Sequence, residues 1–140
     1  MRLIDADEEV LRLTIPIAPR SKKNSMQIVK FGNRPSLRPS RIYSEYEKNV
    51  LKVIPQEARL KINYPVNIQA LFFTETRRKV DITNLNSALH DSLVKAEVLE
   101  DDNRDIVVSS DGSRVFWDKV NPRTEVIITR YTDPYEVWHE

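Results

Sequence analysis

The stretch VDITNLNSALHDSLVKAEVLEDDN, residues 80–103, decides the fold because it carries a clear helical pattern together with several carboxylates. Apolar side chains recur at helical spacing once Thr83 or Asn84 has capped the N-terminus, which predicts a helix from there to about Val98. The apolar face of this predicted helix consists of Leu85, Ala88, Leu89, Leu93 and Ala96. The acidic turn at 100–103 ends the helix.

Strand patterns lie on both sides of this helix. Residues 11–17 alternate apolar and polar side chains, and an apolar run follows Pro65. The predicted strands span residues 11–17, 66–73, 105–110, 114–117 and 124–131. The pair Asp111-Gly112 favours a hairpin turn between the third and fourth of these strands.

An earlier helix is predicted over residues 42–54. Ser40 is its expected cap, and Pro55 stops it. Four residues keep a helical spacing and form its expected apolar side, namely Ile42, Tyr46, Val50 and Val53. Together, these elements predict a single α+β domain in which two helices pack on one face of a mixed β-sheet.

The chain length bounds the domain organisation. A chain of 140 residues is long enough for one hydrophobic core and too short for two. We expect an acidic extension over 1–10, a folded domain over 11–131 and a C-terminal tail over 132–140, which either stays loose or docks through Tyr135 and Trp138.

The composition excludes several classes of protein. Without cysteine there is no disulfide scaffold, zinc knuckle or thiol nucleophile. The two histidines, His90 and His139, accompany no nucleophile motif, and no apolar stretch approaches twenty residues. The first ten residues are acidic and unlike a signal peptide. We therefore expect a cytoplasmic protein with no membrane partner.

Charge is balanced overall and segregated along the chain. The 22 basic and 21 acidic residues nearly cancel. Residues 12–79 hold 15 basic and 4 acidic residues, whereas residues 80–140 hold 6 basic and 13 acidic residues. A basic segment suits phosphate, and an acidic one suits a hard divalent cation. Sequence order alone leaves open whether folding mixes the two sets.

The basic residues concentrate in a predicted connection over residues 18–41. A connection of this length in a small domain is usually functional or disordered. The candidate DNA-binding residues are Arg20, Lys22, Lys23, Asn24, Lys30, Arg34 and Arg38 in this connection, with Arg77, Arg78 and Lys79 directly before Asp81. A solvated charged edge is the alternative interpretation.

The acidic residues suggest where chemistry takes place. Asp81 precedes the second predicted helix, Asp91 lies within it, and Asp101 and Asp102 follow it. Oxygen ligands of this kind suit Mg²⁺ or Mn²⁺, which would polarise a phosphate for hydrolysis. Ordinary roles as a helix-terminal acid, a solvated face and a polar turn remain open.

The length of the predicted helix sets a geometric condition on these carboxylates. A helix of about sixteen residues is about 24 Å long. Asp81 and Asp102 flank its two ends, so they meet only if the segment after Leu99 folds back along the helix.

Residues 80–103 resemble the signature of the RusA family of Holliday-junction resolvases, which has a D-x-D-N-L segment, a helix with an internal aspartate and a D-D pair. The resemblance extends to IPIAPRSKKNS at 15–25 and PSRIYSEYEKNV at 39–50, and covers most of residues 11–130. It implies a small homodimer that binds four-way DNA junctions and cuts them with Mg²⁺ by paired symmetric nicks, in DNA recombination and repair.

Transferred position by position, the resemblance implies catalytic and metal-binding roles for Asp81, Asp91 and Asp102, with Asp101 as a further ligand. The second aspartate of the family segment falls on Thr83, and a lysine early in the family's helix falls on Ser87. The substitutions remove a carboxylate ligand and a cation. They leave open a second hypothesis, a catalytically weak or inactive protein that binds branched DNA.

Overall fold

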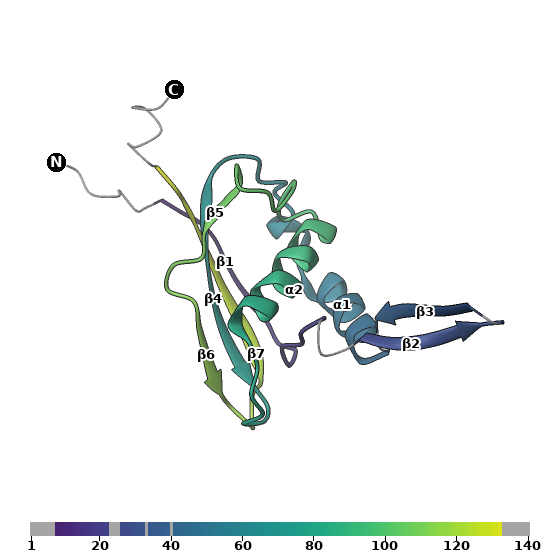
Figure 1. The fold of residues 1–140 in the computed structure, drawn as a ribbon. Helices are drawn as coiled ribbons and strands as arrows, with labels where there is room; N and C mark the ends of the chain where they lie inside the picture. The colour runs from purple at the N-terminus through teal and green to yellow at the C-terminus, as the bar shows by residue number, and fades with distance from the viewer. Residues whose placement is uncertain (1–7, 23–25, 33, 40, 133–140) are drawn as a thin grey trace.

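The protein is described by a computed structural model that covers residues 8–22, 26–32, 34–39 and 41–132 (Figure 1). It contains a five-stranded sheet in which β1 (Glu9–Ile15), β7 (Arg123–Arg130) and β4 (Val66–Thr74) are antiparallel neighbours. Two short strands, β5 (Val107–Ser109) and β6 (Arg114–Trp117), pair in parallel with the other edge of β4. The sheet is therefore mixed, as the sequence predicts.

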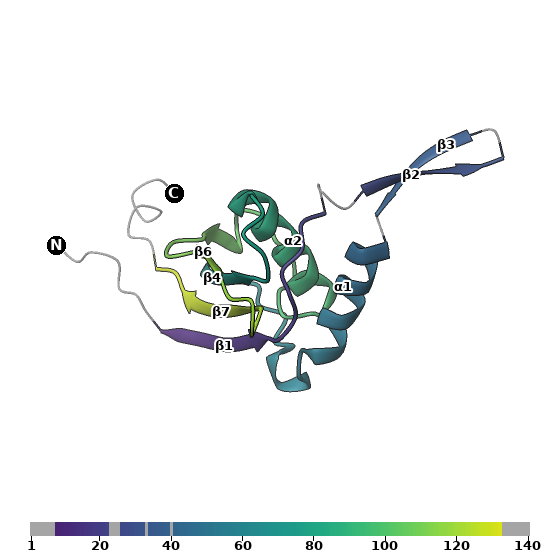
Figure 2. The ribbon, with the colours of Figure 1, turned by 90° about the horizontal axis from the view of Figure 1, so that it is seen from below.

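Two helices cover one face of this sheet, α1 (Arg41–Val53) and α2 (Ile82–Lys95) (Figures 1 and 2). The side chains of β4 alternate strictly, and the buried set faces the helices. Phe72, Ile68 and Leu89 are among the largest fully buried side chains of the resulting core. Burying each stabilises the fold by about 1.5–3 kcal/mol relative to an exposed position. The predicted α+β class is confirmed.

The second predicted helix keeps its expected apolar face but not its expected ends. Asp81 caps it, because its carboxylate accepts a hydrogen bond from the Thr83 N–H at 2.9 Å; neither Thr83 nor Asn84 is the cap. At the other end Glu97 adopts a left-handed φ of 64°, and Val98 N–H donates to the Leu93 carbonyl at 2.9 Å. That closure ends α2 at Lys95, before the predicted Val98.

The first predicted helix keeps two of its four expected apolar residues, Tyr46 and Val50, in the core and leaves the other two exposed. Tyr43, Tyr46 and Val50 are buried, whereas Ile42 and Val53 are 60% and 39% exposed. After α1, a short 3₁₀ helix, η2 (Gln56–Ala58), leads into Arg59. The expected cap, Ser40, lies outside the described residues, as do residues 1–7 and 133–140 of the predicted extension and tail.

Arg59 fastens the two helices to each other at their C-terminal ends. Its guanidinium donates to the carbonyls of Leu51 at 2.7 Å and Ile54 at 3.1 Å, and to that of Ala96 at 3.2 Å. Carbonyls at the end of a helix lack partners within it. One side chain thus satisfies orphan acceptors at the ends of both helices and fixes their relative position.

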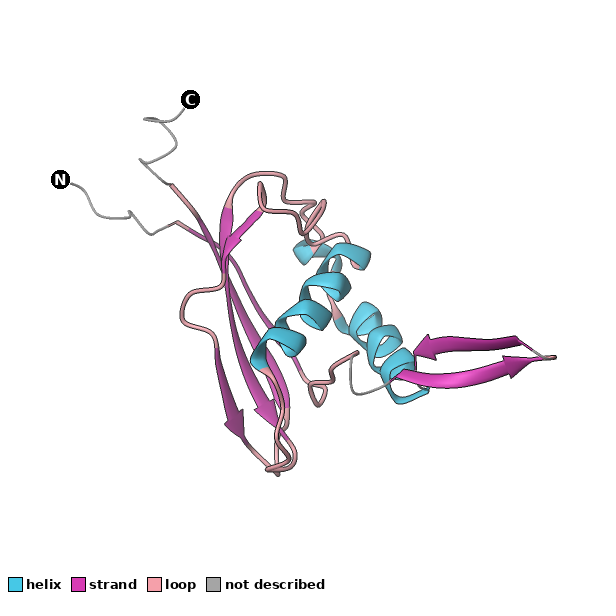
Figure 3. Ribbon diagram, in the orientation of Figure 1, coloured by secondary structure: helices cyan, strands magenta, loops and turns pink. Residues whose placement is uncertain are grey.

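The predicted long connection contains a separate β-hairpin. Its strands are β2 (Met26–Phe31) and β3 (Arg34–Pro39), which form a two-stranded sheet of their own. The hairpin extends away from the domain beyond the start of α1 (Figure 3). Phe31 pairs with Arg34 across a two-residue turn, in which Gly32 adopts a φ of 62°. A glycine followed by Asn33 between two strands is a hairpin signal. The sequence of the connection therefore contained enough information to predict β2 and β3.

The predicted hairpin at Asp111-Gly112 is wrong, because β5 and β6 do not pair with each other. Both pair with β4, and residues 110–113 form a break between them. Side chains of β4 bridge the break: Asn67 accepts from the Asp111 N–H at 2.7 Å, and Gln69 donates to the Gly112 carbonyl at 3.1 Å. These bonds satisfy backbone groups of residues 110–113 that have no partner in a neighbouring strand. No described helix is both long and apolar enough to cross a membrane.

Candidate functional site

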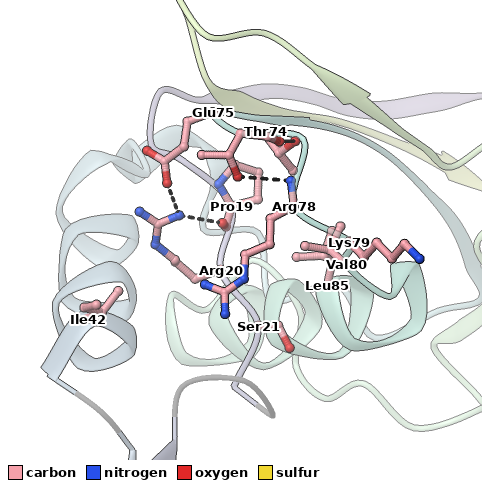
Figure 4. A pocket seen from close by; sticks show the side chains of 11 residues that line it. Pro19, Arg20, Ser21, Ile42, Thr74, Glu75, Arg78, Lys79, Val80 and Leu85 are labelled. Atoms are coloured by element: carbon pink, nitrogen blue, oxygen red, sulfur yellow. Dashed lines mark hydrogen bonds and ion pairs between the residues drawn. The ribbon is translucent and has the colours of Figure 1, made fainter.

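A pocket of about 310 Å³ lies beside the N-terminus of α2, between residues 19–21, the start of α1 and the loop over 74–80 (Figure 4). Three cations line it, Arg20, Arg78 and Lys79, together with the single acid Glu75. Val80 and Leu85, on either side of Asp81 in sequence, also line it. The basic segment before Val80 therefore meets the first predicted carboxylate at one end of the domain.

Asp81 holds its place because it caps α2. Its Oδ1 atom accepts the Thr83 N–H, and the residue is exposed. A carboxylate has several acceptor positions, so the capping bond leaves others open to a cation or a nucleophilic water.

Asp91 and Asp102 both act on a partly buried histidine, His90. Burial lowers the pKa of His90, while the negative charges of Asp102 and Asp91 oppose that shift. The segment after α2 therefore brings Asp102 within electrostatic reach of the middle of the helix. Asp91 also lies close to Tyr43 of α1. The pKa of this tyrosine is raised to about 12, mainly by burial and then by the negative charges of Glu47 and Asp91.

Asp101 shapes the loop after α2. Its carboxylate accepts from the Asp102 N–H at 2.8 Å and from the Asn103 side-chain amide at 3.1 Å. Both carboxylate oxygens are engaged in local hydrogen bonds, which is the behaviour of a turn-forming residue. Asp101 orients the backbone that carries Asp102.

The predicted carboxylates are not gathered into one cluster. Ten residues of helix separate Asp81 from Asp91, a rise of about 15 Å. Asp91 and Asp102 share a neighbour in His90, but nothing brings Asp81 to them. Within the described residues, no group of three or more histidine, cysteine, aspartate or glutamate side chains is placed to hold a metal ion.

Apart from Arg77, the predicted DNA-binding residues divide into three groups. Arg20, Arg78 and Lys79 line the pocket, and the ammonium group of Lys79 points away from the two guanidinium groups in Figure 4. Lys22 and Arg34 are exposed. Lys23 and Asn24 lie outside the described residues, as do the side chains of Lys30 and Arg38.

Arg77 lies over an exposed indole. Its guanidinium is 4.2 Å from the centre of the Trp117 ring, and the Trp117 Nε1–H donates to the Glu75 carbonyl at 3.3 Å. Trp117 is 47% exposed, so its contact with Arg77 lies at the surface. The contacts fix the loop over 74–80 to the end of β6 and orient Arg77 along the same edge as the pocket.

The family model for endodeoxyribonuclease RusA matches residues 16–129, well over half of the chain. The chain belongs to the RusA family. No individual curated protein matches it. The match covers the pocket, α2 and the acidic loop after it, so the resemblance read from residues 80–103 is confirmed.

The chemistry of the RusA signature in this chain fits a hard divalent cation. All candidate ligands are carboxylates, and Mg²⁺ typically takes only one or two of these together with waters and substrate phosphates. Asp81, whose capping bond occupies one oxygen, meets that requirement beside a basic pocket. A shell of three protein ligands does not form among the described residues.

The two departures from the RusA pattern lie on the surface. Thr83 and Ser87 are both exposed, on the same side of α2 as Asp91 and opposite its apolar face. Lys95 is engaged elsewhere, in an ion pair with Glu47 at 2.8 Å, and does not replace the family lysine. Lys79 is the cation nearest in sequence to Asp81.

Among the side chains of the pocket that sequence reasoning missed are Glu75 and Ser21. Glu75 forms an ion pair with Arg20, and Ser21 is buried with a hydroxyl that has no hydrogen-bond partner. Neither belongs to a motif. Residues 12–79 hold 15 basic residues and only four acidic ones, of which Glu75 is one. The rarity of acidic residues in this segment was the sequence feature that could have pointed to Glu75.

Proposed function

We propose that the protein is a divalent-metal-dependent endonuclease that resolves four-way DNA junctions by paired symmetric nicks, in DNA recombination and repair. The observation that carries the proposal is membership of the RusA family over residues 16–129, in which the signature aspartate, Asp81, directly follows Val80 of a basic pocket. Because two strands of a junction must be cut symmetrically, we further propose that two copies of the chain act together as a homodimer.

In this mechanism the cations bind the DNA backbone. Arg78 and Lys79 come directly before Asp81, so a phosphate bound by either of them would lie near that carboxylate. Exposed cations of the hairpin, such as Arg34, extend the contact to a neighbouring arm. These contacts position the substrate without reading its sequence.

We assign the carboxylates different tasks. Asp81 would hold a Mg²⁺ or Mn²⁺ ion. Asp91 and Asp102 are the predicted further catalytic residues, and because about 15 Å of helix separates Asp91 from Asp81 they would act apart from that ion, with Asp101 orienting Asp102. Such an ion, when bound, stabilises negative charge on the phosphate and lowers the pKa of a water. Thr83 supplies a neutral hydroxyl where the family has a carboxylate, so fewer negative charges hold the ion.

The test uses labelled four-way junctions and linear duplexes of the same sequence, with Mg²⁺ or Mn²⁺. We expect paired symmetric nicks in the junction alone, and a loss of more than about 100-fold in rate in Asp81→Asn. Asparagine caps a helix as well as aspartate does, so this variant separates chemistry from folding. Absence of any cleavage that Asp81→Asn abolishes would contradict the proposal.

A second candidate function is binding of branched DNA with little or no cleavage. It is favoured by Thr83 and Ser87, and by the lack of a three-ligand cluster among the residues that the structure describes. This function predicts tight, salt-sensitive junction binding without hydrolysis in any divalent metal. Symmetric paired nicks would exclude it.

A further inference from the structure

The pocket beside Asp81 has an apolar part that phosphate binding does not explain. Ile42 of α1 and Val80 of the loop before α2 both line it, and they are 60% and 38% exposed. They come from different elements and line the same pocket, on opposite sides of the Arg20 and Arg78 side chains in the view of Figure 4. Exposed apolar side chains gathered in a pocket indicate a ligand with an apolar surface.

The polar part of the same pocket has an unmet hydrogen-bonding group. Ser21 is only 6% exposed, it lines the pocket, and its hydroxyl oxygen is buried without a hydrogen-bond partner. An unsatisfied buried hydroxyl costs about 1–3 kcal/mol. Because this oxygen is buried, a ligand in the pocket would bond to it only after a shift of the Ser21 side chain.

An internal acid occupies the best anion position in this pocket. The Glu75 carboxylate forms an ion pair with the Arg20 guanidinium, which also donates to the Pro19 carbonyl at 3.3 Å. Both charged side chains are partly exposed, at 40% for Glu75 and 33% for Arg20, so water and other anions reach the pair. A pair of this kind is worth at most about 1 kcal/mol, which a more highly charged anion outweighs.

We propose that this pocket holds a single unstacked nucleotide of the branched DNA, with its phosphate on Arg20 in place of Glu75 and its base against Ile42 and Val80. The proposal deepens the proposed function, on which it rests, by giving the enzyme a site for one nucleotide next to the cleaved strand. An unpaired base costs less to take out of the stack than a paired one. Until DNA binds, the ion pair with Glu75 holds the Arg20 side chain in position.

The charge of the pocket favours a nucleotide over other amphipathic ligands. Three cations and one acid give a net positive lining, and the apolar side chains lie within the same 310 Å³. A nucleotide joins an anion and an apolar ring within one covalent unit. Base contacts with apolar or aromatic side chains are tolerant of sequence, which suits a site for branched rather than specific DNA.

The first test measures binding to a four-way junction without divalent metal, so that nothing is cut. Glu75→Gln removes the ion pair that competes with the phosphate for Arg20, and we expect junction binding to tighten about threefold. Glu97→Gln is the matched control, since Glu97 is also an exposed glutamate with a cation partner, Lys61, at 3.9 Å, but lies at the far end of α2. If the two substitutions change junction affinity equally, the effect comes from net charge alone, and Glu75 does not compete with DNA for Arg20.

The second test asks whether a base enters the pocket. Wild-type protein is compared on an intact junction and on one whose branch-point nucleotides lack bases, and we expect about fivefold weaker binding to the second. Ile42→Ala should weaken binding to the intact junction and abolish the difference. Val53→Ala, the matched change at the other end of α1, should keep it. If wild-type binding ignores the missing bases, the pocket takes phosphate alone and the proposal fails.

Failure of this inference is distinguishable from failure of the proposed function. If the wild type cuts junctions symmetrically but the Glu75 and Ile42 variants behave like their controls, the nucleotide pocket is wrong and the resolvase remains. If the wild type neither binds nor cuts junctions, the proposed function itself is wrong, and the pocket with it.

Discussion

Asp81 serves two purposes with one side chain. Its carboxylate caps α2 through the Thr83 N–H, and the same bond fixes the direction in which its remaining acceptor positions face. A ligand on a helix terminus is held more rigidly than one on a free loop, because the helix sets its backbone. The residue type required for the cap and the type required for a divalent cation coincide here.

Thr83→Asp tests whether the departure from the family pattern limits activity. The position is exposed and lies in the first turn of α2, where a negative charge interacts favourably with the helix dipole by about 0.3–1 kcal/mol. We expect the protein to remain folded and the Mg²⁺ concentration for half-maximal cleavage to fall about tenfold, since a carboxylate adds charge to the site. A titration of cleavage rate against Mg²⁺ measures this.

The control for that substitution is Thr83→Asn, which has a similar shape and no charge. An equal improvement in both variants, or none in Thr83→Asp, would mean that the second carboxylate of the family segment is not what this chain lacks.

Asp118 gives the fold a pH-dependent contact in the turn between β6 and β7. It accepts from the Asn121 and Val120 N–H groups at 3.0 and 3.1 Å and from Arg123 at 3.0 Å. These bonds, that of Asn121 first, lower the pKa of Asp118 below its ordinary 3.8. The stabilisation is therefore fully present above pH 3.8 and is lost as the pH falls through the lower folded pKa.

Asp118→Ala should consequently lower Tm at pH 7, and the difference from the wild type should shrink as the pH falls below 3.8. Thermal unfolding followed by circular dichroism across this range measures the effect. Asp105→Ala, an exposed aspartate outside the turn, is the control. A Tm difference that does not change with pH would show that the Asp118 contacts do not depend on its charge.

Among the elements, α2 was predicted most completely. Five apolar residues at helical spacing specify its buried face, and all five are buried. Its ends were not predicted, because Asp81 competes with Thr83 for the cap and because the left-handed turn at Glu97 carries no glycine. Periodicity reports a face reliably, whereas a boundary depends on one or two hydrogen bonds.

The pairing of β5 and β6 shows a different limit. Asp111-Gly112 has the composition of a hairpin turn, yet both strands pair with β4 because Asn67 and Gln69 hold residues 110–113 against it. Those bonds join residues more than forty positions apart. The separation of Asp81 from Asp102 likewise follows from the path of the chain after α2, which no local pattern specifies.

The β2–β3 hairpin depends on its turn. Gly32 has a φ of 62°, where a β-branched residue costs about 1–2 kcal/mol, and no atom lies within 4 Å of the position of an added Cβ. A two-stranded sheet alone is marginally stable. Gly32→Val should therefore weaken junction binding about tenfold through loss of the hairpin and leave the Tm of the main domain unchanged.

Gly32→Asn is the matched control, since asparagine tolerates this backbone conformation. Binding measured by fluorescence anisotropy, alongside thermal unfolding, separates the two effects. If both variants bind like the wild type, the hairpin does not contribute to DNA binding.

Over the whole molecule, the segregation of charge along the sequence becomes a partial segregation in space. The cations of residues 19–21 and 74–80 meet at the N-terminal end of α2, and the hairpin extends beyond the start of α1 (Figures 1 and 4). The acidic turn after α2 lies toward the opposite end of that helix (Figure 1). Asp81 is the carboxylate at the basic end, and Asp91 and Asp102 lie farther along.

This arrangement predicts that salt sensitivity depends on position rather than on net charge, which is only +1. Arg78→Ala removes one phosphate contact at the basic end, so it should weaken binding to junctions of any sequence and reduce the slope of log K against log salt by about 1. Arg130→Ala removes the same charge at the C-terminal end of β7, where Arg130 lies over Tyr64, and should leave the slope unchanged. Measuring the association constant for one junction over a series of salt concentrations gives both slopes. If the two variants change the slope equally, DNA contacts both ends of the domain alike. A phosphate bound by Arg78 then does not position the cleaved bond beside Asp81.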